Sequence, residues 1–360
     1  MSRNTRDCAV IKPFIICFTC ACQSLFSIAQ PLKVEPSISA PETPRQARVV
    51  IVRDAAASQT FNPRPEVIQK MVDRAITNLT GTATVAAAWS SLVSTQDIVG
   101  IKVFSGPGRI SGTRPAVVAA VVQGLLEAKV PPRSIIIWDK QILDLRMAGF
   151  FDLAERFGVR VVSSASAGYD EKTPPYDTAF IGHLVWGDLE FGKKGEGAGR
   201  KSFVSKLLTK EITRIINITP LLNHNYAGVS GNLYGLSIGS VDNTLRFENS
   251  TERLATAVPE IYALPALGDR VALNIVDALI CQYEGGQEGL LHYSATLNEL
   301  RFSTDPVALD VLSIRELERL RSTPHFALST NSLELYQNAS LLELGISDPR
   351  KIQVERIPEP

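Results

Sequence analysis

Three side chains that can carry charge or exchange protons have sequence neighbours that suggest a functional role. Lys102 lies inside an apolar run, Asp277 is followed by Ala-Leu-Ile, and His224 stands between two asparagines. A buried ammonium or carboxylate needs a partner charge, a ligand or water. An imidazole can act as a general base or bind a metal, with Asp277 or Asp242 as its partner. We predict that Lys102, His224 and Asp277 form a catalytic group, and that His224 and Asp277 hold the metal if the protein uses a divalent one.

The densest group of polar side chains lies in residues 223–247, where many glycines separate them. Glycine lets a backbone approach a ligand closely. The Arg246 guanidinium can clamp a carboxylate or phosphate through two parallel hydrogen bonds. The predicted ligand-binding residues are Asn223, Asn232, Asp242, Asn243 and Arg246. The alternative is that His224 and its neighbours only satisfy backbone groups of a loop.

Polar residues near the ends of the predicted strands indicate a ligand site at the carboxyl ends of those strands. Lys102 lies near the end of one strand, Asp139 and Asp277 follow two others, and Asn217 follows the central one. Ligands of open α/β sheets bind at the carboxyl ends of the strands. Two alternatives remain open, namely that Lys102 lies on an edge strand with its ammonium in solvent and that Asp139 is a helix cap or turn residue.

Three other features favour structural roles. Residues 195–201 are glycine-rich and basic but lack the Gly-Lys-Ser/Thr ending of a nucleotide P-loop, which favours a flexible hairpin. Asp305 and Pro306 are typical of a helix start, because Asp is a preferred cap and Pro a preferred first helical residue. Cys281 has apolar neighbours and is expected to be a buried small hydrophobe.

The elements that must position these residues alternate between apolar runs and helical spacing. An α/β fold is predicted, with a mostly parallel sheet covered by helices and an irregular central insertion at residues 168–203, because strands apolar on both faces are typical of such sheets. The expected strands are residues 47–52, 97–103, 134–138, 159–163, 212–218, 270–276 and 351–356. The expected helices are residues 65–79, 115–128, 150–157, 252–264 and 306–320.

The amino terminus has the pattern of an export signal. Basic residues precede an apolar stretch at 13–29, and Ser27-Ile28-Ala29 provides the small residues that a signal peptidase reads. We predict a signal peptide at 1–29 that is cleaved after Ala29, a flexible tether at 30–46 and a single α/β domain at 47–360. An uncleaved anchor is the alternative, but the apolar stretch is shorter than the ~20 residues that span a bilayer. The expected product is periplasmic or extracellular, without a membrane span.

The composition argues against binding to nucleic acids or anionic membranes and against an iron–sulfur cluster. The chain has 360 residues with 37 basic and 37 acidic side chains, so it lacks the positive charge that nucleic acids and anionic membranes attract. Four of its five cysteines lie in the first 22 residues, which leaves Cys281 alone in the predicted domain. One cysteine cannot build an iron–sulfur cluster or a disulfide framework.

Five segments in order resemble the family called domain of unknown function 362. They are IKVF (residues 101–104), SIIIWD (134–139), IINITPLLNH (215–224), LNIVDALICQYEGG (273–286) and STDPVALD (303–310). The resemblance implies no established activity, and it places Lys102, His224, Asp277 and Asp305 on motif positions of the family. Some members carry ferredoxin-like iron–sulfur segments, which this chain lacks. The chain also departs from the family pattern where Phe104 replaces an asparagine and where residues 221–223 offer no lysine.

The residues and the resemblance together favour an exported α/β enzyme that binds a small anionic or metal-chelated molecule at the strand ends. The alternative is a non-catalytic extracytoplasmic ligand-binding protein, which would use the same concave site without turnover. A third interpretation is a structural protein of the cell envelope, for which the strand ends would form a filled, apolar crevice.

Overall fold

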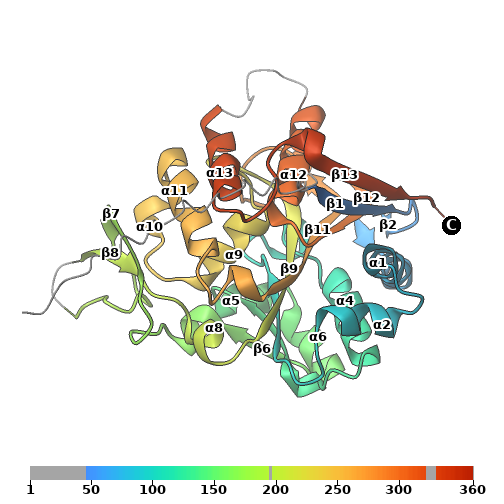
Figure 1. The fold of residues 1–360 in the computed structure, drawn as a ribbon, viewed down its shortest axis with the longest axis horizontal. Coiled ribbons are helices and arrows are strands. Elements are labelled where there is room, and N and C mark those ends of the chain that lie inside the picture. Colours follow the sequence, from blue (N-terminus) through green and yellow to red (C-terminus); the bar gives the residue numbers. More distant parts are fainter. Residues whose placement is uncertain (1–45, 194–196, 322–329, 360) are drawn as a thin grey trace, which may run out of the picture. The chain divides into compact units, whose positions relative to one another are not determined.

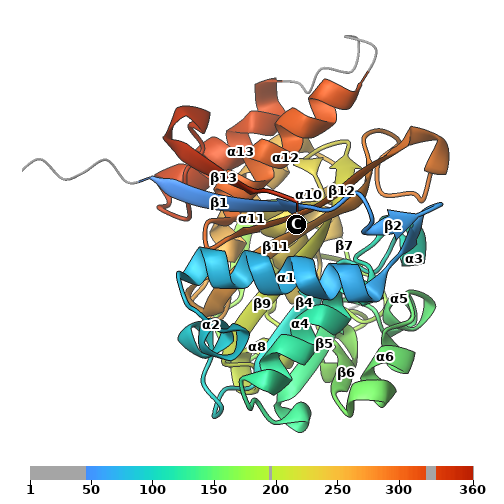
Figure 2. The ribbon, with the colours of Figure 1, turned by 90° about the vertical axis from the view of Figure 1, so that its right-hand side faces the viewer.

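A central mixed sheet organises the protein. The structure is a computed structural model that describes residues 46–193, 197–321 and 330–359, so the predicted signal peptide and all but the last residue of the tether lie outside the described residues. The strand order is β13-β1-β12-β11-β9-β4-β5-β6 (Figures 1 and 2). The strands are β1 (Ala47–Arg53), β4 (Val99–Val103), β5 (Ile135–Asp139), β6 (Arg160–Ser163), β9 (Arg214–His224), β11 (Val271–Gln282), β12 (Ser294–Ser303) and β13 (Ile352–Ile357).

Most neighbouring strands are parallel, which confirms the predicted α/β class. Strands β11, β9, β4, β5 and β6 run in one direction, and β13 is parallel to β1. Only β12 is antiparallel to both of its neighbours in this order. Because parallel strands end at the same edge of a sheet, the carboxyl ends of β9, β4 and β5 lie together. In register, Lys102 of β4 is opposite Asn217 of β9 and Trp138 of β5.

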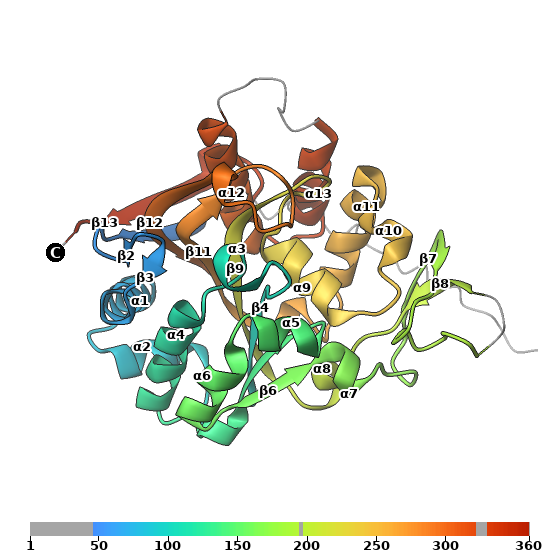
Figure 3. The ribbon, with the colours of Figure 1, turned by 180° about the vertical axis from the view of Figure 1, so that it is seen from behind.

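Helices cover both faces of the sheet because successive strand residues point to opposite sides. Val49 and Ile51 of β1 belong to one hydrophobic core, whereas Val50 and Val52 belong to the other. Figures 2 and 3 show the two sets of helices on opposite sides of the sheet. One set is α1 (Pro65–Thr80), α2 (Val85–Leu92), α4 (Pro115–Glu127) and α6 (Phe150–Phe157), and the other is α8 (Lys206–Lys210), α9 (Asn232–Ser240), α11 (Thr251–Tyr262), α12 (Pro306–Leu320) and α13 (Thr330–Leu341).

Local signals explain where several helices begin. Proline occupies the first turn of α1, α4 and α12, where its missing N–H costs nothing. The carboxylate of Asp305 accepts a hydrogen bond from the Ala308 backbone N–H at 2.8 Å, which confirms its predicted role as the cap of α12. Helix α1 ends at Gly81, whose φ of 67° favours glycine.

The central insertion forms a hairpin apart from the main sheet. Strands β7 (Tyr176–His183) and β8 (Ala198–Ser202) pair with each other, and β7 contacts α10 (Leu245–Glu248), as Figure 3 shows. The remaining short strands and α-helices are β2 (Ser58–Gln59), β3 (Asn62–Pro63), β10 (Gly228–Val229), α3 (Gly108–Ser111), α5 (Ile142–Met147) and α7 (Ser164–Ala167). No helix in the described ranges is both long enough and apolar enough to cross a bilayer.

The structure differs from the expected elements in several places. Strands β9 and β11 continue to His224 and Gln282, so His224 and Asp277 lie within strands rather than after them. The glycine-rich stretch contains α9 instead of only a loop, and every residue of α9 is buried. A helix buried all round has no polar face, so its sequence shows no helical period. Strand β12 and helix α13 were not predicted, because neither has a clear apolar period.

Candidate functional site

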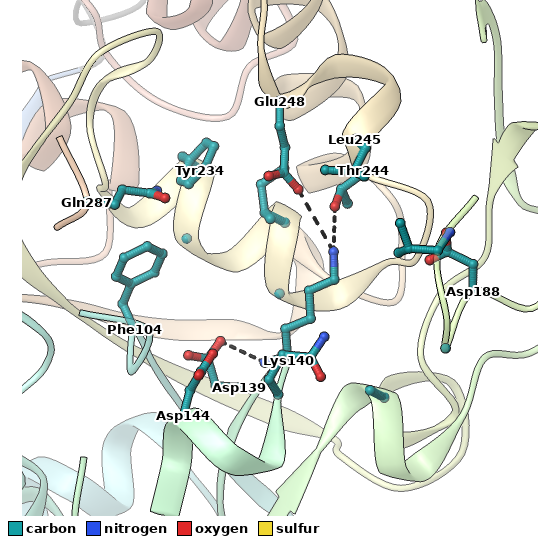
Figure 4. A pocket seen from close by; sticks show the side chains of 18 of the residues that line it. Phe104, Asp139, Lys140, Asp144, Asp188, Tyr234, Thr244, Leu245, Glu248 and Gln287 are labelled. Atoms are coloured by element: carbon teal, nitrogen blue, oxygen red, sulfur yellow. Dashed lines mark hydrogen bonds and ion pairs between the residues drawn. The ribbon is translucent and has the colours of Figure 1, made fainter. Parts of the chain in front are cut away.

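A cavity of about 340 Å³ opens where strands β4 and β5 end. Its walls come from the residues after these strands, from α9 and α10, and from the loop after β7 (Figure 4). This is the position at which α/β sheets usually bind ligands. The charged residues that line the cavity are Asp139, Lys140, Asp144, Asp188 and Glu248. Aromatic residues that line it are Phe104, Tyr169, Trp186 and Tyr234.

A buried ion pair lies behind the cavity wall. The Lys102 ammonium is 2.9 Å from Asp139 and donates to the Val103 carbonyl at 2.7 Å, and Lys102 is completely buried. The second oxygen of Asp139 accepts hydrogen bonds from the backbone N–H and the hydroxyl of Ser105, each at 2.7 Å. Lys102 therefore has the partner carboxylate that its burial requires. Asp139 lines the cavity with oxygens that already have partners.

Helix α9 approaches this ion pair through a glycine. A Cβ atom added to Gly239 would lie 2.3 Å from Cε of Lys102 and 2.9 Å from its Nζ. Both distances are shorter than real Cβ contacts, so any larger residue would displace the lysine or the helix. Gly239 thus lets α9 form a wall of the cavity directly above the pair of Lys102 and Asp139.

Lys140 places an amine inside the cavity. Its Nζ donates to the Thr244 hydroxyl at 2.5 Å and is 4.0 Å from a carboxylate oxygen of Glu248, as Figure 4 shows. Its backbone N–H donates to Asp139 at 2.8 Å, which anchors the base of the side chain. Burial lowers the pKa of Lys140, although Glu248, Asp188, Asp242 and Asp139 oppose that effect. The side chain is still 23% exposed, and Lys140 is one of the residues that line the cavity.

The other carboxylates that line the cavity differ in their hydrogen bonds, their pKa and their exposure. Asp188 accepts backbone N–H bonds from Val185 at 2.8 Å and Asn243 at 2.9 Å, so it fastens the loop after β7. Burial, helped by the charge of Asp139, raises the pKa of Asp144. The Glu248 side chain is 25% exposed and faces Lys140. Glu248 is therefore the carboxylate best placed to exchange a proton with the amine.

A second hollow adjoins the cavity and contains His224. The two share Tyr234, Glu248 and Gln287 as lining residues. Nδ1 of His224 accepts backbone N–H bonds from Tyr226 at 3.1 Å and Ala227 at 2.9 Å. Burial lowers the pKa of His224 to about 4, so the ring is neutral at pH 7 with its proton on Nε2. In this state the imidazole can donate one hydrogen bond.

The predicted catalytic group is divided among separate contact networks. The carboxylate of Asp277 is 2.9 Å from the Arg114 guanidinium and also accepts the Arg114 backbone N–H at 3.0 Å. Lys102 pairs with Asp139 instead, and His224 bonds to its own loop. No hydrogen bond or ion pair within the described part of the chain joins Lys102, His224 and Asp277 to one another. His224 alone of the three lines either of the two adjoining spaces.

The predicted ligand-binding residues are bonded within the protein. Asn232 donates to Asp310 at 2.9 Å, and Asp242 accepts backbone N–H bonds from Leu189 and Phe203. The guanidinium of Arg246 is buried and donates to the Thr178 hydroxyl and to two backbone carbonyls of the β7 segment. Asn223 accepts from Arg321, and Asn243 donates to the Lys201 carbonyl. Each of the five side chains therefore makes at least one hydrogen bond within the protein.

Sequence reasoning missed Lys140 and Glu248. Lys140 directly follows Asp139, so its position at the end of a predicted strand was the signal that could have found it. Nothing local marks Glu248, because it reaches Lys140 only through the packing of α10.

A metal ion held by the protein needs several His, Cys, Asp or Glu side chains close together. Across residues 46–193, 197–321 and 330–359, no three His, Cys, Asp or Glu side chains are grouped to hold a metal ion. The metal predicted for His224 and Asp277 stays a prediction.

Comparison with known proteins identifies one family. The model of the family described as Domain of unknown function (DUF362) matches residues 99–315, which is more than half of the chain. The match runs from the start of β4 into α12 and includes every residue named above as lining the cavity. No curated protein matches the chain.

Proposed function

The chain belongs to the DUF362 family, whose description states no activity, and we propose that it is an enzyme that acts on a small molecule in the strand-end cavity. The observation that carries this proposal is the Lys140 amine, which stands inside the cavity between Thr244 and Glu248. A lysine in a partly buried site beside a carboxylate is a common arrangement for proton transfer.

The chemistry that this arrangement supports is acid–base catalysis. Because burial lowers the pKa of Lys140, more of its amine is unprotonated near neutral pH than in an exposed lysine. The unprotonated amine can accept a proton from a substrate. Glu248 lies close enough to exchange that proton, directly or through one water, and Thr244 orients the amine.

The charged side chains that line the cavity indicate which charge the substrate carries. Four carboxylates and one amine line the space. This excess of negative charge favours a neutral or positively charged substrate over the anionic one expected from the sequence. Phe104, Tyr234 and the exposed Trp186 offer faces for an apolar part of the molecule. A cavity of about 340 Å³ suits a small molecule.

A substrate screen tests the proposal. Purified protein is incubated with a defined mixture of small metabolites, and mass spectrometry follows the loss of each compound. We expect at least one compound to be consumed, and Lys140→Met to slow its loss by roughly 100-fold or more. The matched control is Lys210→Met, because Lys210 is 52% exposed, pairs with Asp170 at 3.9 Å and does not line the cavity.

The same screen tests the non-catalytic alternative. A compound that raises the melting temperature of the protein, loses this effect in Lys140→Met and is never consumed would contradict the enzyme proposal. That result would instead favour a ligand-binding protein that uses the same cavity.

A further inference from the structure

We infer that the Lys140 amine reacts covalently with a carbonyl substrate and forms an imine. This inference rests on the proposed function and narrows the substrate class to aldehydes and ketones. Its basis is geometric, because the Nζ atom lies at the wall of a cavity with a hydroxyl and a carboxylate beside it. Imine formation needs these parts, namely an accessible amine, room for the carbonyl compound and a group that carries protons.

Lys140 is better suited to this reaction than two fully buried cations of the protein, Lys102 and Arg114. Lys102 is completely buried, and its ammonium is held by Asp139 and the Val103 carbonyl. Arg114 is held by Asp277 and two backbone carbonyls, and a guanidinium does not lose its proton in proteins. Among the described residues that line the cavity, Lys140 is the only lysine.

The surroundings of Lys140 favour the reactive form of the amine. The lowered pKa increases the fraction of unprotonated Nζ, which is the nucleophile. Ile238 and Leu245 line the same cavity and make part of its wall apolar. The backbone bond from Lys140 to Asp139 holds the start of the side chain, so the amine reaches the cavity from a fixed point.

The reaction balances without any further reagent. The nitrogen lone pair attacks the carbonyl carbon, a C–N bond forms, and the carbonyl π electrons move to oxygen. Glu248 carries one proton from nitrogen to that oxygen, which gives a carbinolamine. The C–O bond then breaks as the C=N bond forms, and Glu248 carries the second nitrogen proton to the leaving hydroxyl. One amine and one carbonyl compound thus give one imine and one water.

Reductive trapping tests the inference. The full protein is mixed with dihydroxyacetone and sodium cyanoborohydride at pH 7, and hydride from the reagent converts any imine to a stable secondary amine. Peptide mass spectrometry then locates the added mass. We expect Lys140 to be modified faster than the exposed Lys210, because its lowered pKa leaves a larger fraction of free amine. Modification of Lys140 should also saturate with probe concentration.

Two variants separate a nucleophile from a structural cation. Lys140→Arg keeps a positive charge beside Glu248 but cannot form an imine, so it should fold, show no modification at position 140 and have no turnover. Lys140→Met should behave in the same way. If Lys140 only paired with Glu248, the arginine variant would keep turnover, and the inference would be overturned.

The two proposals fail in different ways. If a compound is consumed and Lys140→Arg abolishes its consumption, but Lys140 is trapped no faster than Lys210, the amine transfers protons and the imine is excluded. If Lys140 is trapped selectively while the metabolite screen finds no turnover, the imine chemistry stands and the proposed enzymatic function is contradicted.

Discussion

Two pairs of opposite charges in this protein differ in almost every respect. Arg114 and Asp277 are 2.9 Å apart, with side chains only 2% and 0% exposed. Lys140 and Glu248 are 4.0 Å apart, with side chains 23% and 25% exposed. The first pair is closed, since Asp277 also accepts the Arg114 backbone N–H and the guanidinium donates to two carbonyls. The second pair is open to a cavity.

The difference shows what each pair can do. Asp277 lies in β11 and Arg114 immediately precedes α4, so the closed pair joins the sheet to the start of a helix. Both oxygens of Asp277 and both terminal nitrogens of Arg114 already have partners within the protein. The open pair places an amine and a carboxylate side by side at the wall of a cavity, where a small molecule can approach both of them. Burial alone therefore does not identify a functional charge.

The largest expected effect is on the closed pair. Asp277→Ala leaves the Arg114 guanidinium buried without its counterion, and the free energy of unfolding should fall by about 3–5 kcal/mol. Urea denaturation followed by circular dichroism measures this loss. Glu248→Ala, which removes the carboxylate of the open pair, should cost less than about 1 kcal/mol. Equal losses in the two variants would remove the distinction between the pairs.

A buried carboxylate without a cation sharpens the comparison. Within the described ranges Asp310 has no ion-pair partner and accepts hydrogen bonds from the backbone N–H groups of Asn232 and Leu233 at the start of α9. Burial raises its pKa to about 7. The folded state therefore favours the protonated form, and stability is lost as the pH rises from about 4 to about 7.

The free energy of unfolding measured across this pH range tests Asp310. The wild-type protein should lose up to about 1.4 kcal/mol per pH unit relative to Asp310→Asn, which cannot titrate. His224 has the opposite sign, because its lowered pKa removes stability as the pH falls from 6.5 to about 4. The difference between wild type and variant isolates Asp310, and a flat difference would show that Asp310 stays charged.

A substitution on α9 tests how tightly the ion pair of Lys102 and Asp139 is enclosed. In Gly239→Ala the new methyl group would overlap the Lys102 side chain, and we expect a loss of about 1–3 kcal/mol in stability. Gly235→Ala is the matched control on the same helix, since its Cβ would only reach ordinary contact distance, 3.4 Å from Cγ2 of Thr219. It should be neutral or stabilising by up to about 1 kcal/mol. Similar results for both glycines would contradict the close packing.

The smallest expected effect on stability belongs to Lys140. Lys140→Met should change the free energy of unfolding by less than about 1 kcal/mol at pH 7, because the pair is open and partly solvated. Since burial lowers the pKa of Lys140, the unfolded chain binds its proton more readily, and wild-type stability should rise relative to the variant as the pH approaches 10.5. Thermal unfolding at several pH values measures this trend. A large loss at pH 7 would make Lys140 a structural cation.

Local patterns were sufficient for much of the fold. The apolar runs that became β1, β4 and β5 and the helical spacing of α1, α4 and α12 were predicted within a few residues. The cap at Asp305 was also predicted, because its partner is only three residues away. Helix α9 was missed because it is buried on all sides and its residues lack a polar face.

The site depended on contacts between distant segments. Lys102 required a partner, and that much followed from a lysine within an apolar strand, but only the pairing of β4 with β5 identified Asp139. Lys140 meets Thr244 across more than a hundred residues of chain. Apolar periodicity is a local property that each segment carries by itself, so the sequence determined the class of fold. Which charges are closed and which face a cavity is decided by the register of strands and the packing of helices, and these exist only in the folded chain.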